Sequence, residues 1–173
     1  KGPSALFLAP GALQRLNEAA SACTWSGLVP DHLRSDNNND RTPDVVILIA
    51  MAARLGEDPL TLMQESHVVQ GKAGFTAKYQ IGRLNRSGLI KGRVRWRTAG
   101  EIKRTDSRGD RLGAVRADSD FECTAYVIDA ETDEEVSYTL PWSTVVAEGW
   151  LAKNGSKWQS MPDVMARYRS AVF

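Results

Sequence analysis

The first half of the chain has apolar residues at helical spacing. The expected helices cover residues 11–24, 45–55 and 59–65. Thr42, Pro43 and Asp44 are a strong start for the second helix, because they supply an N-cap, a proline in the first turn and an acid near the positive end of the helix dipole. Gly56 is a typical residue just beyond a helix end. Since this helix is apolar almost all round, we expect it to be buried.

The second half alternates between apolar and polar residues, which is the pattern of strands. The expected strands cover residues 67–69, 72–75, 89–97, 121–128 and 136–140. The first two flank Gln70-Gly71 and are predicted to form a small hairpin. Thr76 is then expected to cap a helix over 77–87, and a short helix is expected over 143–148, capped by its serine.

A glycine-broken loop near the end of the chain leads into a last predicted helix. Ser160 is the expected N-cap of that helix. At 100° per residue, the positions that share one face form the expected buried stripe: Met161, Val164, Met165, Tyr168 and Val172. Arg169 lies on the flank of this stripe, whereas Arg167 is four residues from Asp163 and is expected to pair with it.

The length of 173 residues predicts one domain, 1–173, with a core that needs no disulfide. The stretches 35–42 and 98–119 are predicted to be flexible loops. Cys23 and Cys123 lack the paired spacing of a metal or redox site. One disulfide between them is formally possible, but two buried, reduced thiols of a cytosolic protein are the expectation. No apolar run is long enough to cross a bilayer, so we expect no membrane partner.

Charge is strongly segregated along the chain although the formal net charge is only +1. Residues 83–116 contain eleven basic and three acidic side chains, whereas residues 117–148 contain nine acidic and no basic ones. A basic and an acidic face suit a protein that binds a polyanion without general stickiness. Two other interpretations stay open, namely head-to-tail pairing of copies and ion pairing within one monomer.

The motifs of several enzyme classes are missing. The sequence has no GxxxxGK[ST] phosphate loop and no GxGxxG after a strand, so ATP-driven strand exchange is not expected. His32 and His67 have no partner at ligand spacing. The acidic stretch 129–135 is a conceivable metal site for a nuclease, but it lacks the glycine and the spacing of a calcium loop and lies where a hairpin needs a polar turn. We therefore expect no catalytic residues, no bound metal and no cofactor.

The basic side chains are the more informative chemistry. Arg93, Arg95 and Arg97 lie on one face of a predicted strand and form a ladder that suits successive phosphates, with a solvated sheet face as the alternative. Lys72 lies beside Gly71 at a hairpin tip, where a backbone can approach a phosphate closely. For Trp158 two roles stay open, stacking on a base and packing in the protein.

Three blocks of sequence, in this order, carry a resemblance to a known family. The first is Leu28-Val29-Pro30 with the following helix at Pro43, and the second runs over 53–60 and on to 68–72. The third is Trp158-Gln159-Ser160-Met161-Pro162 with the basic residues after it. In order and spacing they resemble the RecT branch of the phage recombinases, the single-strand annealing proteins related to lambda Red beta, over about residues 28–173.

The resemblance implies a protein that binds single-stranded DNA and anneals complementary strands without ATP. It implies an α+β fold, in which a small antiparallel sheet packs with helices and a basic groove holds DNA along a ring or helical filament of copies. It also implies a phage exonuclease partner, annealed duplex as a second ligand and a phage-encoded protein in the bacterial cytoplasm. Magnesium is expected at most to modulate annealing. Single-strand protection without annealing is the first alternative, and a metal-dependent nuclease the second.

The family pattern and the charge pattern together give a set of candidate nucleic-acid contacts. These residues are Lys72, Lys78, Arg83, Arg86, Arg93, Arg95, Arg97, Lys153, Lys157, Trp158, Arg167 and Arg169. Lys72, Lys157, Trp158, Arg167 and Arg169 are the positions that match the family directly. Asp163, where some members are basic, and the longer loop at Asn37-Asn38-Asn39 depart from it.

Overall fold

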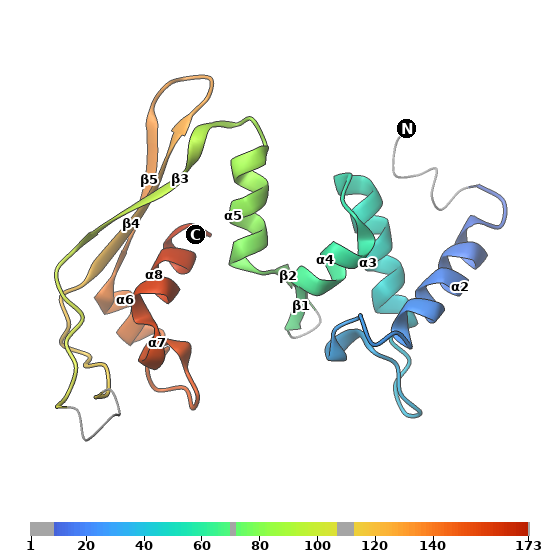
Figure 1. Cartoon of the computed structure of the whole chain (residues 1–173), viewed down its shortest axis with the longest axis horizontal. Helices are drawn as coiled ribbons and strands as arrows, with labels where there is room; N and C mark the ends of the chain where they lie inside the picture. The colour runs from blue at the N-terminus through green and yellow to red at the C-terminus, as the bar shows by residue number, and fades with distance from the viewer. Residues whose placement is uncertain (1–8, 70–71, 107–112, 173) are drawn as a thin grey trace. The chain divides into compact units, whose positions relative to one another are not determined.

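The computed structural model describes residues 9–69, 72–106 and 113–172 of the chain. The expected α+β class is confirmed, since helices accompany two small antiparallel sheets (Figure 1). Contacts group the chain into two compact units, Lys1–Thr76 and Ala77–Phe173, and each has its own hydrophobic cluster. The chain that the length predicts to be a single domain thus contains two compact units.

The first unit contains helices packed around a small core. Its elements are α2 (Ala12–Thr24), the 3-10 turn η1 (Asp31–Leu33), α3 (Thr42–Leu55), α4 (Pro59–Glu65), β1 (Ser66–Val69) and β2 (Lys72–Phe75). The three predicted helices are confirmed, and so is the hairpin, in which β1 and β2 pair antiparallel. Asp58 caps α4, because its Oδ2 accepts from the amide of Thr61 at 2.7 Å.

Helix α3 differs from its prediction in two ways. Thr42 is its first helical residue, and the N-cap is Arg41, without a side-chain cap bond. The helix buries one face, at Val45, Leu48 and Ala52, whereas Ile47 is 56% exposed. An apolar helix on the outside of a unit has too few neighbours to cover it all round. At its end, Gly56 has the left-handed conformation expected of a helix stop, with φ of 67°.

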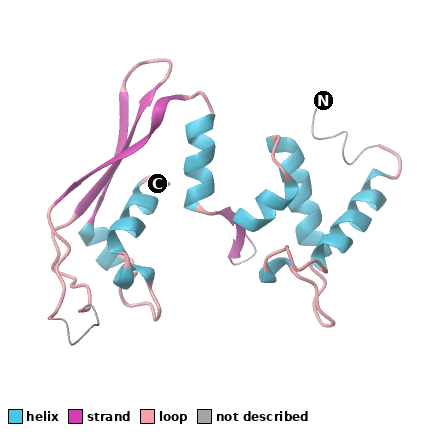
Figure 2. Ribbon diagram, viewed as in Figure 1, coloured by secondary structure: helices cyan, strands magenta, loops and turns pink. Residues whose placement is uncertain are grey.

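The second unit consists of a three-stranded sheet and the helices that pack on it. Its elements are α5 (Ala77–Arg86), β3 (Ile90–Ala99), β4 (Glu122–Asp129), β5 (Glu135–Pro141), α6 (Trp142–Ala147), α7 (Lys157–Ser160) and α8 (Pro162–Ser170). The strands are antiparallel in the order β3-β4-β5, close to the predicted ranges. Among the described residues, helices α6 to α8 lie on one face of this sheet (Figure 2). We call that the inner face and the opposite one the outer face.

The strand register assigns side chains to the two faces. Trp96 pairs with Ala125, and Thr98 pairs with the buried Cys123, so these residues lie on the inner face. Arg95 pairs with Tyr126, and Arg97 pairs with Thr124, so their side chains lie on the outer face. On the inner side, burial raises the pKa of the Cys123 thiol. Both cysteines are free.

The core of the second unit is a chain of aromatic rings. Phe121 contacts Trp142 edge to face at 6.2 Å between ring centroids, and Trp142 contacts Trp158 in the same way at 6.3 Å. Trp158 then stacks on Trp150 at 5.1 Å. Such contacts add to the stabilisation that comes from burying the rings.

The buried stripe expected for the last helix is only partly right: Met165 packs against the core of the unit, but the fully buried face of the helix is a different one. Pro162, Ala166 and Ser170 face the core, whereas Met161 and Tyr168 are about two-fifths exposed. Small side chains at this spacing let α8 approach β4 closely, and Ser170 Oγ lies 3.6 Å from Cys123 Sγ. Ser160 ends α7 instead of capping α8. Similarly, α6 begins at Trp142 with no side-chain cap, so the cap predicted at residue 143 is also wrong.

The connection from β3 to β4 is irregular, as predicted for 98–119, but its described parts are held to the second unit. Arg104 Nη1 donates to the carbonyl of Gln159, and the amide of Val115 donates to Gln159 Oε1 at 2.8 Å. Ser119 is buried and its hydroxyl accepts from the amide of Lys103. Residues 107–112 lie outside the described residues.

Candidate nucleic-acid interface

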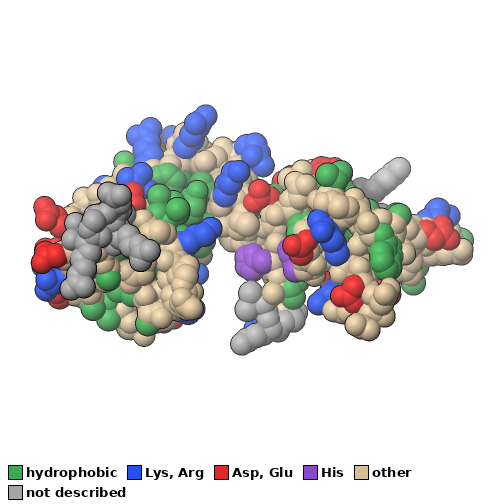
Figure 3. Space-filling view, turned by 60° about the horizontal axis from the view of Figure 1, so that its bottom comes forward, with side chains coloured by type: hydrophobic (Ala, Val, Ile, Leu, Met, Phe, Trp, Pro, Cys, Tyr) green, Lys and Arg blue, Asp and Glu red, His purple; other side chains and the backbone are tan. Residues whose placement is uncertain are grey.

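The outer face of the sheet presents a row of cations along β3. Lys91, Arg93, Arg95 and Arg97 are all exposed, and Tyr126 of β4 lies among them as a half-buried aromatic ring. Lys and Arg side chains also gather along one side of this unit in the space-filling view (left-hand part of Figure 3). Exposed cations beside an aromatic ring are the combination that binds a nucleic-acid strand by its phosphates.

A bulge breaks the ladder predicted for the three arginines. Lys91 pairs with Ile128 and Arg95 pairs with Tyr126, so the three residues 92–94 of β3 oppose the single residue Val127 of β4. Gly92 has φ of 81°, a left-handed conformation that side chains rarely adopt. The amide of Val94 donates to Asn85 Oδ1 at 2.8 Å. Because Asn85 lies on α5, this hydrogen bond fixes the bulge to that helix.

The bulge forms a hollow of about 390 Å³ on the outer face. Three of its lining residues are cationic, namely Lys91, Arg93 and Arg95. Asp133 also lines it, and its Oδ2 lies 2.8 Å from Lys91 Nζ. Among the described residues, neither Arg93 nor Arg95 takes part in an ion pair.

Arg97 is fixed at the other end of the row. Its two terminal nitrogens donate to the carboxylate of Glu135 at 2.6 and 3.2 Å. Its guanidinium carbon lies 4.9 Å from the centroid of the Tyr126 ring. The hydrogen bonds that Arg97 donates to Glu135 raise the pKa of Arg97 above its ordinary value. Ion pairing within the monomer, left open by the sequence, therefore occurs at two positions between β3 and the acidic stretch.

The acidic stretch 129–135 is the turn between β4 and β5. Hydrogen bonds from the amides of Thr132 and Glu131 to Asp129 Oδ1, both 2.8 Å long, lower the pKa of that carboxyl. Asp133 has φ of 63°, which aspartate tolerates in turns. In the part of the chain that the structure describes, no three His, Cys, Asp or Glu side chains are grouped to hold a metal ion.

The other predicted contacts occupy three further places. Lys78 and Arg86 are exposed on α5, whereas Arg83 on the same helix is half-buried and donates to the Tyr79 hydroxyl at 3.4 Å. Lys153 and Lys157 are exposed in and just after the loop that precedes α7. Lys72 is exposed at the start of β2, in the first unit.

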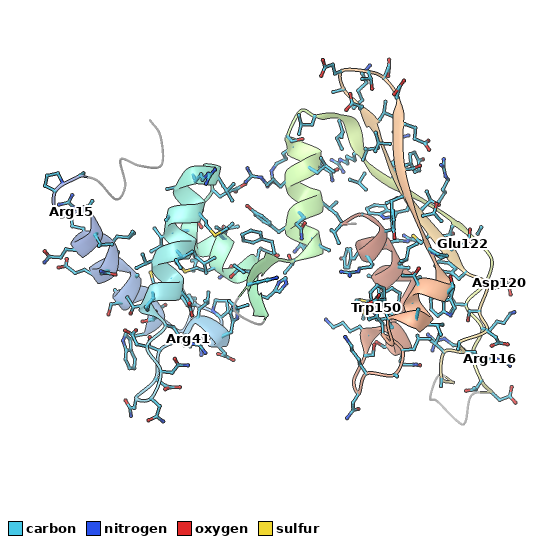
Figure 4. All side chains as sticks on the ribbon, turned by 180° about the vertical axis from the view of Figure 1, so that it is seen from behind. Arg15, Arg41, Arg116, Asp120, Glu122 and Trp150 are labelled. Atoms are coloured by element: carbon cyan, nitrogen blue, oxygen red, sulfur yellow. The ribbon has the colours of Figure 1, made fainter. Side chains whose placement is uncertain are left out.

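The sequence left two roles open for Trp158, stacking on a base and packing in the protein, and the structure shows it packed in the protein. Its ring is 6% exposed and lies between Trp142 and Trp150, so it offers no free face to a base. Trp150, labelled in Figure 4, lies among helices α6 to α8 and carries the Arg169 guanidinium over its other side, 4.8 Å from the ring centroid. Arg169 is therefore exposed but held in place by Trp150.

Arg167 is exposed on α8, and the ion pair expected with Asp163 is not formed among the described residues. Its backbone carbonyl accepts from Trp96 Nε1 at 2.8 Å, which joins α8 to β3. The side chain of Arg167 thus stays available, whereas its backbone holds the unit together.

Lys91, Gly92 and Tyr126 are parts of this surface that the sequence did not single out, and Asp133 was considered there only within the conceivable metal site at 129–135. The sequence did contain one signal for the bulge, because a glycine within a predicted strand often marks a bulge. This glycine lies between two cations, in Lys91-Gly92-Arg93. Asp133 gives no such signal, because the strand register brings it beside Lys91 from 42 positions away.

No family model, curated protein or solved structure matches the chain. No helix among the described residues has the length and apolar character needed to span a bilayer.

Proposed function

We propose that the protein binds single-stranded DNA and promotes annealing of complementary strands without ATP. The observation that carries the proposal is the open outer face of the sheet, where four cations of β3 lie in a row beside Tyr126. The three sequence blocks that resemble RecT-type recombinases support the same function. Magnesium modulates annealing at most, and no cofactor takes part.

The proposed mechanism is templating. Cations on the outer face contact phosphates of one strand, which neutralises part of the repulsion between two strands. Contacts to the backbone read no sequence, so the bases stay free to pair with a second strand. The proposal includes assembly of copies into a ring or filament, with a phage exonuclease as partner in the bacterial cytoplasm.

The test is pairing of two complementary oligonucleotides, one carrying a fluorophore and the other a quencher, without nucleotide. We expect the protein to accelerate quenching by about tenfold or more at low salt, and the gain to fall steeply as salt rises. If the protein binds DNA but the pairing rate falls or stays unchanged, annealing is contradicted. That result favours the alternative, protection of single strands. Cleavage of the strands on adding magnesium contradicts both.

The pair between Arg97 and Glu135 gives a second prediction. Glu135→Gln removes the carboxylate that competes with phosphate for Arg97, so we expect tighter DNA binding, by roughly two- to fivefold. The matched control is Asp118→Asn, which breaks the exposed ion pair of Arg116 with Asp118, also 2.6 Å long, on the connection from β3 to β4. Fluorescence anisotropy with a labelled oligonucleotide measures both variants. Equal changes in the two variants contradict a specific role for Arg97.

A further inference from the structure

The bulge in β3 creates a site that differs from the rest of the cation row. Lys91, Arg93 and Arg95 line one hollow, together with the backbone of Gly92. An ordinary strand places alternate side chains about 6.6–6.8 Å apart along one face. The bulge adds two residues to β3, and its glycine is left-handed. The side chains of Lys91, Arg93 and Arg95 therefore surround one hollow instead of forming a straight row.

One carboxylate already lies in this hollow. Asp133 reaches it from the turn between β4 and β5 and pairs with Lys91 at 2.8 Å, while Arg93 and Arg95 have no ion-pair partner among the described residues. Counting these four side chains, three positive charges face one negative charge. The surplus of two matches the charge of inorganic phosphate as its dianion and exceeds the single charge of a phosphodiester in a DNA strand. The Asp133 carboxylate makes the same kind of contact with the Lys91 ammonium group that a phosphate oxygen would make.

We propose that this hollow is a binding site for one phosphate group, and that the Asp133 carboxylate is an internal occupant which leaves Lys91 when phosphate enters. The hollow of about 390 Å³ is near the lower end of ligand pockets, so it holds a phosphate with its attached sugar as well as a free phosphate ion. As a site for a DNA phosphate, the inference rests on the proposed function. As a phosphate site it stands by itself.

The exchange follows from the exposure of the pair. Side chains of Lys91 and Asp133 are 51% and 71% exposed, and such pairs contribute little to stability, so a phosphate group displaces the carboxylate at small cost. Asp133 tunes affinity in this way: it pairs with Lys91 and so competes with phosphate for this ammonium group.

The test uses backbone amide shifts of the whole protein by NMR, with inorganic phosphate and a short single-stranded oligonucleotide as separate probes. We expect both probes to shift the amides of Gly92 and Arg93. An oligonucleotide with uncharged methylphosphonate linkages is expected to leave them unmoved. Loss of the shift on Arg93→Ala or Arg95→Ala is expected, with affinity lower by roughly tenfold for each. Each lost contact is expected to lower the salt slope of DNA binding by about 0.7.

Asp133→Asn tests the internal occupant, since asparagine also tolerates the left-handed backbone at this position. We expect phosphate binding to tighten by roughly two- to fivefold, with Asp118→Asn as the control without effect. Unchanged affinity in Asp133→Asn overturns the exchange. If DNA binds and anneals but neither probe moves Gly92, the phosphate site is wrong and the proposed function stands. If inorganic phosphate moves Gly92 and no DNA binds, the site stands and the proposed function fails.

Discussion

Trp158→Ala is expected to destabilise the second unit by about 3–5 kcal/mol, the range for removing a large buried aromatic side chain. The ring is 6% exposed and contacts two other tryptophans, at 6.3 Å and 5.1 Å between centroids. Its loss leaves a cavity beside Trp142 and Trp150, and the unit loses both ring contacts. Urea unfolding followed by circular dichroism measures the change in the free energy of unfolding.

Trp25→Ala is the matched control for that experiment. Trp25 is 65% exposed at the end of α2, so the same chemical change should alter stability by less than about 0.5 kcal/mol. If Trp158→Ala is as stable as the control but binds DNA much more weakly, the packing role is wrong and stacking on a base is right.

Gly100→Ala is expected to destabilise the second unit by roughly 2–4 kcal/mol, because two effects add. Gly100 directly follows β3 with φ of 69°, and an added Cβ would lie 2.2 Å from the carbonyl oxygen of Asp120. Figure 4 labels Asp120 on the connection that leads into β4. The amide of Glu101 donates to Asp120 Oδ1 at 3.1 Å, so the two segments cannot separate without losing this bond.

Gly155→Ala separates the two effects. Gly155 has φ of 67°, nearly that of Gly100, but an added Cβ there meets no atom within 4 Å. This variant should show the backbone strain alone, about 1 kcal/mol. Thermal unfolding of both variants provides the comparison, and equal losses at the two glycines would mean that the contact with Asp120 relaxes freely.

Local features of the fold could be predicted from the sequence, because they depend on neighbouring residues. The helix stop at Gly56 and the hairpin before Thr76 are each fixed within a few positions of the chain. The strands of the second unit were equally accessible, since alternation is a local pattern.

Features set by contacts distant in sequence could not be predicted in this way. The apolar stripe expected on α8 was displaced from the fully buried face of the helix, although Met165 packs beside that face. Close packing of a helix on β4 favours the small residues Ala166 and Ser170 over larger ones nearby. Trp158 was ambiguous for the same reason, since its neighbour Trp142 is brought to it by the fold. The candidate site shows the same limit: its arginines are visible in the sequence, but the bulge that gathers them depends on the register with β4.

The aromatic chain of the second unit also determines which spectroscopic signals report on each part of the protein. Of the five tryptophans, only Trp25 belongs to the first unit, and it is exposed already in the folded chain. Intrinsic fluorescence therefore follows unfolding of the second unit almost alone. The stacked rings of Trp150 and Trp158, whose planes lie within 22° of each other, couple electronically in circular dichroism. Arg169 lies against Trp150, so a phosphate that draws this guanidinium away changes the light emitted by that indole.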